Sequence, residues 1–341
     1  MLKSLSPLDG RYQPMTSVLS DYFSEYALIK YRVYVEIKYF RALVDLPLCQ
    51  LDEISKEALL HLDDLYNEFN LNEAEIIKTT EKVTNHDVKA VEYYIKNKFE
   101  LIGLNKYREF VHFGLTSQDI NNTAFPLMIK NGIREEIYPL VLTLISGLKS
   151  KASAYKGIPM LARTHGQPAS PTTLGKEIAV FIERLEDELE LLNLVKYKCK
   201  FGGATGNFNA HKVSYPEIDW PSFADKFIQG LGLKRSKNTT QIAHYDDLGA
   251  IFHSFIRINT ILIDLCRDMW TYVSMDYFKQ KLKEGEIGSS AMPHKVNPID
   301  FENAEGNLGL ANSIFSHLSE KLPVSRLQRD LSDSTVIRNV G

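Results

Sequence analysis

The amino-acid sequence predicts an all-α protein, with an N-terminal helical domain over residues 1–110 and a central bundle of long helices over 111–341. Two observations lead to this prediction. Apolar residues recur at the i, i+3, i+4 spacing over stretches more than twice the usual helix length of ~11–12 residues. Strand patterns, in contrast, are few. Helices this long need an elongated bundle to bury their apolar faces, and copies of the same chain are expected to complete it.

The first part of the chain contains shorter helical patterns, at 21–46, 52–69 and 86–101. The next helix is expected to begin at Thr116, because its hydroxyl stands three residues before Asp119, as in a capping box. Pro139 should kink or divide that helix, since proline lacks the N–H that a helix interior needs. The best strand pattern is short, at 157–164.

The first long helix is expected over 171–200. Ser170 followed by Pro171 is typical of a helix start, with a capping hydroxyl and then proline at the first helical position. The apolar residues that follow keep to one helix face. At ~1.5 Å per residue, such a helix would form a rod of roughly 45 Å.

Two further long helices are expected towards the end of the chain. One covers 246–275, where leucine, isoleucine and phenylalanine residues share a face. The other should begin after Asn297, which can cap it, and Asp300 and Glu302 suit the positive first turn.

Composition narrows the class of protein. The chain has 341 residues, of which 44% are hydrophobic and 24% charged, so it can bury a core. A net charge of −3 with mixed signs gives no basic footprint for nucleic acid. The three cysteines are far apart and lack zinc-ligand spacing, which favours free thiols in a reducing compartment. They are Cys49, Cys199 and Cys266.

Membrane and export signals are weak. The first residues show no apolar segment typical of a secretory signal. The most apolar stretch, 251–266, is interrupted by His253, Arg257 and Asp264 and is too short to span a bilayer. We therefore expect a cytoplasmic protein.

The segment 285–303 combines flexible, nucleophilic and cationic residues ahead of a helix start. Gly285 and Gly288 give backbone freedom, and Lys295 stands just before a helix N-terminus, which favours anions. These features predict a mobile lid over an anionic substrate. The alternative interpretation is a polar loop between helices.

Three histidines stand near expected helix starts. His165 lies in a turn beside Gly166, where it could act as a general acid or base or could cap local carbonyls. His112 precedes Thr116, and His86 opens another helix with Asn85 and Asp87 beside it. Thr116 and Asp87 could hold a ligand, or they could serve only as helix caps.

The tail 325–339 places arginines among hydroxyls, which suits phosphate or carboxylate oxygens, although a solvated turn would look the same. The arginines are Arg326, Arg329 and Arg338, and the hydroxyls include those of Ser332, Ser334 and Thr335. Arg11 and Tyr12 alone indicate little. The sequence contains no P-loop, dinucleotide-binding or HExxH spacing.

The eleven residues GSSAMPHKVNP (288–298) match the pattern GSSxMPxKxNP of the fumarase/aspartase superfamily. The stretches RTHGQPA, HFGLTSQD and TNHDVKAVEYY narrow the resemblance to the adenylosuccinate lyase family, of the bacterial purine-biosynthesis type. The resemblance covers essentially the whole chain. It includes PLDGRY near the start and LPVSRLQRDLSDSTVIRN near the end.

The resemblance implies a mostly helical homotetramer in which three subunits build each active site. It implies β-elimination of fumarate from adenylosuccinate, giving AMP, and from SAICAR, giving AICAR, in purine (IMP and AMP) biosynthesis. No metal or organic cofactor is implied. Small-molecule substrates are the expected partners, with neither nucleic acid nor membrane.

The resemblance also implies roles for individual residues. Ser289 would be the general base, with Ser290 as the adjacent alternative, and His165 would be the general acid. His86 would support His165 on the phosphate side, and Glu302 would be associated with the active-site histidine. The substrate-binding residues would be Arg11, Tyr12, Asn85, His86, Asp87, Thr116, Ser117, Gln241, Lys295, Asn297, Asn303, Arg329, Ser334 and Arg338.

One feature departs from the family pattern. Family members are usually longer, so we expect this chain to be truncated, with the last long bundle helix and the small C-terminal domain absent. Lower stability and reduced or absent activity would follow. Two alternative functions are another superfamily activity, such as argininosuccinate lyase or fumarase, and a non-catalytic structural role like that of the lens crystallins. The tail arginines and TNHDVKAVEYY favour the nucleotide, and Ser289, His165 and Lys295 argue against a structural role.

Overall fold

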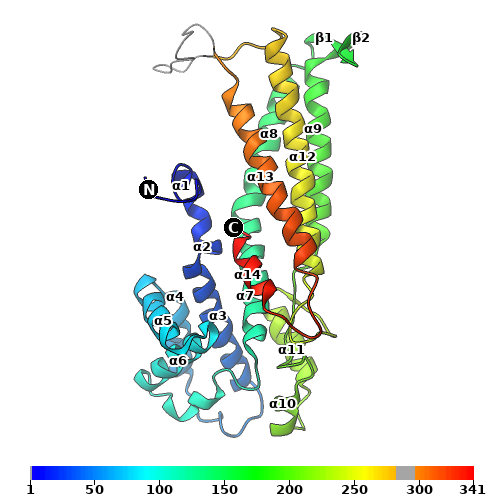
Figure 1. Cartoon of the computed structure of the whole chain (residues 1–341). Helices are drawn as coiled ribbons and strands as arrows, with labels where there is room; N and C mark the ends of the chain where they lie inside the picture. Colours follow the sequence, from blue (N-terminus) through cyan, green and yellow to red (C-terminus); the bar gives the residue numbers. More distant parts are fainter. Residues whose placement is uncertain (1, 282–295) are drawn as a thin grey trace. The chain divides into compact units, whose positions relative to one another are not determined.

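The computed structural model describes residues 2–281 and 296–341, and the predicted all-α class is confirmed (Figure 1). Two small two-stranded sheets accompany the helices, with β1 antiparallel to β2 and β3 parallel to β4. The helices are α1 Gln13–Thr16, α2 Ser20–Phe23, α3 Glu25–Val44, α4 Lys56–Asn67, α5 Leu71–Thr84, α6 Asp87–Leu101, α7 Ser117–Gly132, α8 Tyr138–Ala154, α9 Leu174–Leu194, α10 Asn209–Ser214, α11 Trp220–Gly230, α12 Asp246–Ser274, α13 Ile299–Lys321 and α14 Ser332–Val336. The strands are β1 Pro159–Thr164, β2 Gln167–Thr173, β3 Lys198–Cys199 and β4 Lys234–Arg235.

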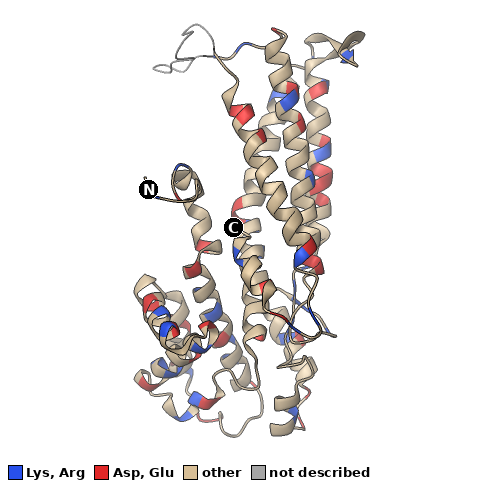
Figure 2. Cartoon of the chain, in the orientation of Figure 1, with Lys and Arg blue, Asp and Glu red and all other residues tan. Residues whose placement is uncertain are grey.

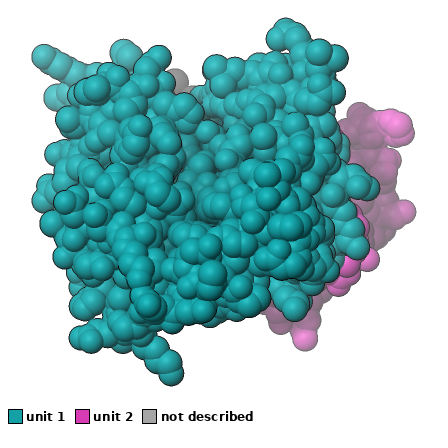
Figure 3. Space-filling model, turned by 90° about the horizontal axis from the view of Figure 1, so that it is seen from below, with its two compact units in different colours: residues 1–138, 196–247, 322–341 teal, residues 139–195, 248–321 magenta. Residues whose placement is uncertain are grey.

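The chain packs into two compact units, coloured separately in Figure 3. Unit 1 comprises Met1–Tyr138, Lys196–Asp247 and Leu322–Gly341, and unit 2 comprises Pro139–Val195 and Leu248–Lys321. Both units are discontinuous in sequence: the two segments of unit 2 lie between the three segments of unit 1 along the chain. The division into consecutive domains 1–110 and 111–341 stays a prediction.

Unit 1 is organised around α3. Ser24 caps this helix by accepting a hydrogen bond from the Ala27 N–H, and the apolar residues of α3 are almost completely buried against α6 and α7. The predicted helices at 21–46, 52–69 and 86–101 correspond to α3, α4 and α6. Helix α5 was not predicted, because only Ala74 and Ile77 of its residues are buried and its apolar pattern is correspondingly weak.

Unit 2 is a bundle in which the long helices α8, α9, α12 and α13 lie side by side (Figure 1). An ion pair joins α9 to α12, with Arg184 Nη1 2.6 Å from Asp264 Oδ2. The amide of Asn259 on α12 donates to Asn312 on α13 at 2.9 Å. Figure 2 shows acidic and basic side chains interspersed along these helices rather than separated by sign.

Helix α12 confirms the helix predicted over 246–275. The whole helix is long and apolar enough to cross a bilayer, although the stretch 251–266 within it is too short to do so. Half of its most apolar window is buried inside the protein, as in the core helix of a bundle.

The prediction that a helix begins at Ser170 and Pro171 is wrong. Both residues belong to β2, where Pro171 pairs with Leu161 of β1. A two-stranded hairpin has only edge strands, so a proline without an N–H is tolerated there. Helix α9 begins three residues later, because the Thr173 side chain accepts from the Lys176 N–H. The predicted strand at 157–164 is confirmed by β1.

Other helix boundaries agree with the sequence. Helix α7 begins at Ser117, next to the predicted Thr116 cap, and a π-helical turn over Ile133–Ile137 separates it from α8. Pro139 stands in the first turn of α8, so the predicted disturbance of the helix is found directly before it, as a change from α-helical to π-helical hydrogen bonding. Helix α13 begins at Ile299 with Asp300 and Glu302 in its first turn, as predicted.

Candidate active site

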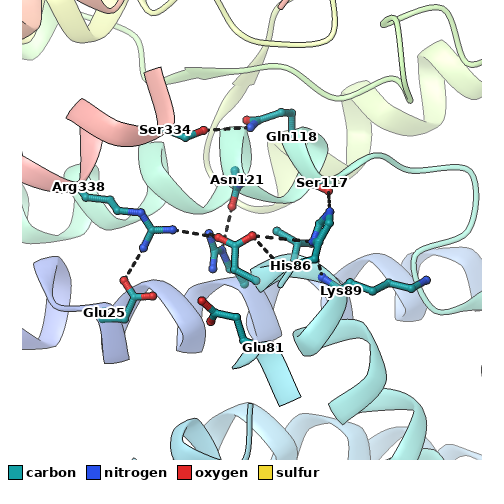
Figure 4. A network of polar contacts seen from close by, with 12 residues as sticks. Glu25, Glu81, His86, Lys89, Ser117, Gln118, Asn121, Ser334 and Arg338 are labelled. Carbon is teal, nitrogen blue, oxygen red and sulfur yellow. Dashed lines mark hydrogen bonds and ion pairs between the residues drawn. The ribbon is translucent and has the colours of Figure 1, made fainter. Parts of the chain in front are cut away.

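Three segments that are far apart in sequence meet within unit 1 (Figure 4). They are the junction of α5 and α6 around His86, the start of α7 around Ser117, and the tail around Ser334 and Arg338. Each segment was predicted to bind substrate. Together they form a partly exposed cluster of polar groups. It contains the imidazole of His86, the hydroxyls of Ser117 and Ser334, the guanidinium groups of Arg32 and Arg338, and carboxylates that include Asp87 and Glu25.

His86 is the N-cap of α6. Asn85 turns the chain in the left-handed conformation, with φ of 51°, and the His86 Nδ1 then accepts a hydrogen bond from the Lys89 N–H at 3.1 Å. In the neutral ring the proton must therefore sit on Nε2, which lies 3.3 Å from the Ser117 Oγ. Since the His86 side chain is 50% exposed, its Nε2–H is available for a ligand.

Asp87 binds two arginines. Its Oδ2 lies 2.6 Å from Arg32 Nη2 and 2.9 Å from Arg338 Nη2, and its Oδ1 accepts from the Val88 N–H at 2.8 Å. Burial would raise the pKa of Asp87, but the adjacent Arg32 and Arg338 and the backbone hydrogen bond lower it below its ordinary value. Asp87 is therefore ionised at neutral pH.

Arg338 extends this network to Glu25 at the start of α3, with which it also forms an ion pair. Burial would raise the pKa of Glu25, and Arg338 lowers it below the ordinary value. Arg338 is exposed, whereas Arg32 is buried. The exposed guanidinium can therefore exchange its carboxylate partners for the oxygens of an anionic ligand.

Asp119 fixes the start of α7. Its Oδ2 accepts from the Thr116 N–H at 2.8 Å, as the capping box predicted. Its Oδ1 accepts from Lys200 Nζ at 2.7 Å and from the N–H groups of Gly202 and Gly203. Both charged side chains are fully buried. This ion pair ties the Thr116–Ser117 turn to the loop that follows β3.

The tail meets α7 through Gln118. In one orientation its amide nitrogen donates to Ser334 Oγ at 3.5 Å, and in the other its oxygen accepts from Arg329 Nη2 at 2.8 Å. Arg329 also lies 3.5 Å from Ser334 Oγ. Behind them, the buried Tyr245 hydroxyl donates to Asp333 at 3.0 Å. Arg329 and Ser334 are thus held side by side, as a pair that could bind one anion.

His112 pairs with helix α3: its Nδ1 lies 2.5 Å from the fully buried carboxylate of Glu36. Burial would lower the pKa of His112, but the negative charge of Glu36 and its hydrogen bond raise it above the ordinary 6.5. This histidine therefore forms a buried ion pair between the loop before α7 and helix α3.

The His112–Glu36 pair predicts how stability changes with pH. Because the folded pKa of His112 is raised, the folded state binds more protons between pH 6.5 and that pKa. The stabilisation is complete below pH 6.5, and the free energy of unfolding should fall as pH rises above it, by at most about 1.4 kcal/mol per pH unit. Urea unfolding from pH 6 to 9 measures this slope. The Glu36→Gln variant should flatten it, and an unchanged slope would contradict the assignment.

In unit 2, His165 occupies the tip of the β1–β2 hairpin. His165 and Gly166 have φ of 54° and 73° between the paired residues Thr164 and Gln167, as the two central residues of a type I′ turn require. The His165 side chain is exposed. The predicted turn at Gly166 is thereby confirmed, and the imidazole is presented outward from a short, well-defined hairpin.

Glu302 lies in the first turn of α13, where its carboxylate accepts from the Trp270 Nε1–H of α12 at 2.9 Å. Asn303 follows it and accepts from the Asn307 side chain. Asn297 is half-buried two residues before α13, and its carbonyl accepts from the Ile299 N–H at 2.9 Å. His165 and Glu302 thus belong to unit 2, whereas His86 belongs to unit 1.

The remaining predicted residues lie outside these contacts. Arg11 is exposed and Tyr12 is half-buried immediately before α1, and Gln241 is half-buried in the segment before α12. Ser289, Ser290 and Lys295 lie outside the described residues. In the described ranges, 2–281 and 296–341, no group of three or more histidine, cysteine or acidic side chains is arranged to hold a metal ion.

Sequence reasoning missed Arg32, Glu25 and Lys200. Arg32 and Glu36 do share the apolar face of α3, four residues apart, and a charged pair on such a face is a signal of buried partners. The partners themselves are 55 to 89 residues away in sequence, and only the fold shows them.

Comparison with known proteins gives a consistent result. The sequence profile of a family described as "Lyase" matches residues 10–312. An adenylosuccinate lyase from Dictyostelium discoideum is 59% identical over 348 residues, and one from Escherichia coli K12 is 49% identical over 342. Each match covers all of this chain and 75% of the relative.

Among solved structures, β-carboxy-cis,cis-muconate cycloisomerase from Acinetobacter calcoaceticus sp. ADP1 is similar, with a TM-score of 0.70. The likeness covers 95% of this chain and 70% of that one, at 18% sequence identity. At this identity the comparison supports the fold alone.

Proposed function

The chain belongs to the adenylosuccinate lyase family and is a lyase, and we propose that it eliminates fumarate from adenylosuccinate, leaving AMP, and from SAICAR, leaving AICAR. In this β-elimination a proton leaves the carbon beside a carboxylate, the electron pair of that C–H bond forms the double bond of fumarate, and the C–N bond breaks. The departing nitrogen takes up a proton. Both reactions serve purine biosynthesis.

Proton transfer requires a base and an acid on the two sides of the substrate. We assign Ser289 as the base and His165 as the acid. The exposed position of His165 at the tip of the β1–β2 hairpin supports the second assignment, because the imidazole can approach a ligand. Glu302, held by Trp270, would be associated with the active-site histidine.

The meeting of three predicted segments in unit 1 is the observation that supports this function most strongly. Adenylosuccinate has a phosphate and two carboxylates, so its site needs several separated anion-binding groups. Arg329 with Ser334 would bind the phosphate, and Thr116 with Ser117 at the start of α7 would bind a carboxylate. His86 would contribute its Nε2–H.

The remaining residues would complete the site. Lys295, Asn297 and the N-terminus of α13 would stabilise the negative charge that develops on the carboxylate when the proton leaves. The predicted roles of Arg11, Tyr12, Asn85, Asp87, Gln241, Asn303 and Arg338 in binding the substrate are retained as part of this proposal.

We propose a cytoplasmic homotetramer in which several subunits build each site. The helices of unit 2 carry exposed apolar side chains that a partner subunit could cover; they include Leu140, Leu142, Val180, Leu191, Leu194, Leu310 and Ile314. Light scattering during size-exclusion chromatography should give four chain masses, and a monodisperse monomer would contradict the assembly.

A substrate panel distinguishes this function from other activities of the superfamily. Purified protein is incubated with adenylosuccinate, argininosuccinate and malate, and fumarate is measured in each case. We expect fumarate from adenylosuccinate at a rate at least about 100-fold above the other two, because the phosphate-binding pair has no role with them. Fumarate mainly from argininosuccinate or malate would overturn the assignment.

A further inference from the structure

Arg32 connects two elements that carry predicted site residues. This residue of α3 is 1% exposed, and its Nη2 donates to Asp87 Oδ2 at 2.6 Å, at the first position of α6. Its Nε donates to Asn121 Oδ1 at 2.8 Å, one turn into α7. One guanidinium group thus joins the beginnings of α6 and α7.

The guanidinium group suits this position for a geometric reason. Its planar fork can donate to two acceptors in fixed directions, whereas a lysine ammonium on a flexible stem is a single point charge. The third nitrogen, Nη1, is buried and has no hydrogen-bond partner among the described residues. The two nitrogens that are paired, Nε and Nη2, reach acceptors at the beginnings of two different helices, so the group forms a bridge between them.

The contact that this bridge controls is the one between His86 and Ser117. His86 immediately precedes Asp87, and Ser117 lies one turn before Asn121 on the same helix. The distance of 3.3 Å between His86 Nε2 and Ser117 Oγ spans the two elements that Arg32 joins. We propose that Arg32 is a positioning residue that holds α6 against α7 and so sets His86 beside Ser117.

Arg338 cannot replace Arg32 in this role. Arg338 also contacts Asp87, but it is exposed and it pairs with Glu25 as well. If Arg338 turns towards a substrate anion, Arg32 remains as the cation that holds Asp87 in place. The expected effect of Arg32 on turnover of adenylosuccinate rests on the proposed function. Its expected effect on the distance between His86 and Ser117 does not.

Two variants separate positioning from charge. Arg32→Lys keeps a cation that can pair with Asp87 but cannot also reach Asn121, and Asn121→Ala keeps Arg32 and Asp87 but removes the acceptor on α7. Both should lower kcat/KM for adenylosuccinate by about 10- to 100-fold, because a misplacement near 1 Å has effects of this size. The control is Arg41→Lys, the same change on the same helix, where the guanidinium pairs with Asp63 of α4. This control should retain wild-type kinetics.

Crystal structures of the variants measure the same effect without turnover. We expect the distance between His86 Nε2 and Ser117 Oγ to increase beyond hydrogen-bonding range in both variants, with α3 itself unchanged. Wild-type distances and wild-type kcat/KM in both variants would overturn the proposal.

If the wild-type protein does not cleave adenylosuccinate, the proposed function fails, and the crystallographic distances still decide the role of Arg32. If Arg32→Lys does not fold, Asn121→Ala provides the decision.

Discussion

Replacing Ser289 with alanine is expected to lower kcat for adenylosuccinate by at least about 100-fold, because removal of a general base has effects of this size. Steady-state assays on the purified variant measure the loss. Binding of AMP should be nearly unchanged, since the groups proposed for the phosphate, Arg329 and Ser334, are not altered. A fall in kcat without loss of binding is the signature of an interaction made only in the transition state.

The matched control is Ser290→Ala, which removes the same hydroxyl from the adjacent residue. The sequence alone left both serines open as the base, so the pair of variants decides between them. A large loss in Ser290→Ala with near-normal turnover in Ser289→Ala would transfer the role to Ser290. Near-normal turnover in both would exclude either serine as the base.

Replacing Asp119 with asparagine is expected to lower the free energy of unfolding by about 3–5 kcal/mol, the range for breaking a buried ion pair. The change leaves the fully buried ammonium of Lys200 without its carboxylate partner, and it weakens the acceptor for the Thr116, Gly202 and Gly203 N–H groups. Urea unfolding followed by circular dichroism measures the loss.

Two further variants test the cause of this loss. The double variant Asp119→Asn with Lys200→Met should lose less stability than Asp119→Asn alone, because no charge is left buried and the amide oxygen can still accept from the backbone N–H groups. Asp64→Asn, the same replacement at a half-exposed position of α4, should stay within about 0.5 kcal/mol of wild type. A loss below about 1 kcal/mol in Asp119→Asn would show that the buried pair does not stabilise the start of α7.

The sequence predicted those features that depend on neighbouring residues. The capping box of Thr116 and Asp119 and the turn at His165 and Gly166 need only local geometry, and both are found in the structure. The helix start at Ser170 and Pro171 was wrong for a non-local reason: pairing with β1 extends this segment as a strand. Local preference for a helix start was outweighed by hydrogen bonding across the hairpin.

The candidate site shows the same difference between features set by neighbouring residues and features set by residues far away in the sequence. His86, Ser117, Ser334 and Arg338 could be named from motifs, because each stands beside characteristic neighbours in the sequence. Arg32 could not, because its partners are on other helices; the charged residues Arg32 and Glu36 on the apolar face of α3 signal buried partners without identifying them. Sequence patterns therefore supplied the groups that we propose to touch a ligand, and the fold was needed to find the group that we propose to hold them in place.

The most direct test of the central claim is product analysis with adenylosuccinate as the only substrate. Purified protein is mixed with adenylosuccinate, and AMP and fumarate are separated and measured over time. The proposed β-elimination predicts that both products appear in equal amounts, with no added metal or organic cofactor. Hydrolysis of the same C–N bond would give AMP with malate in place of fumarate. Either this outcome or no AMP from the folded, wild-type chain would contradict the proposed function.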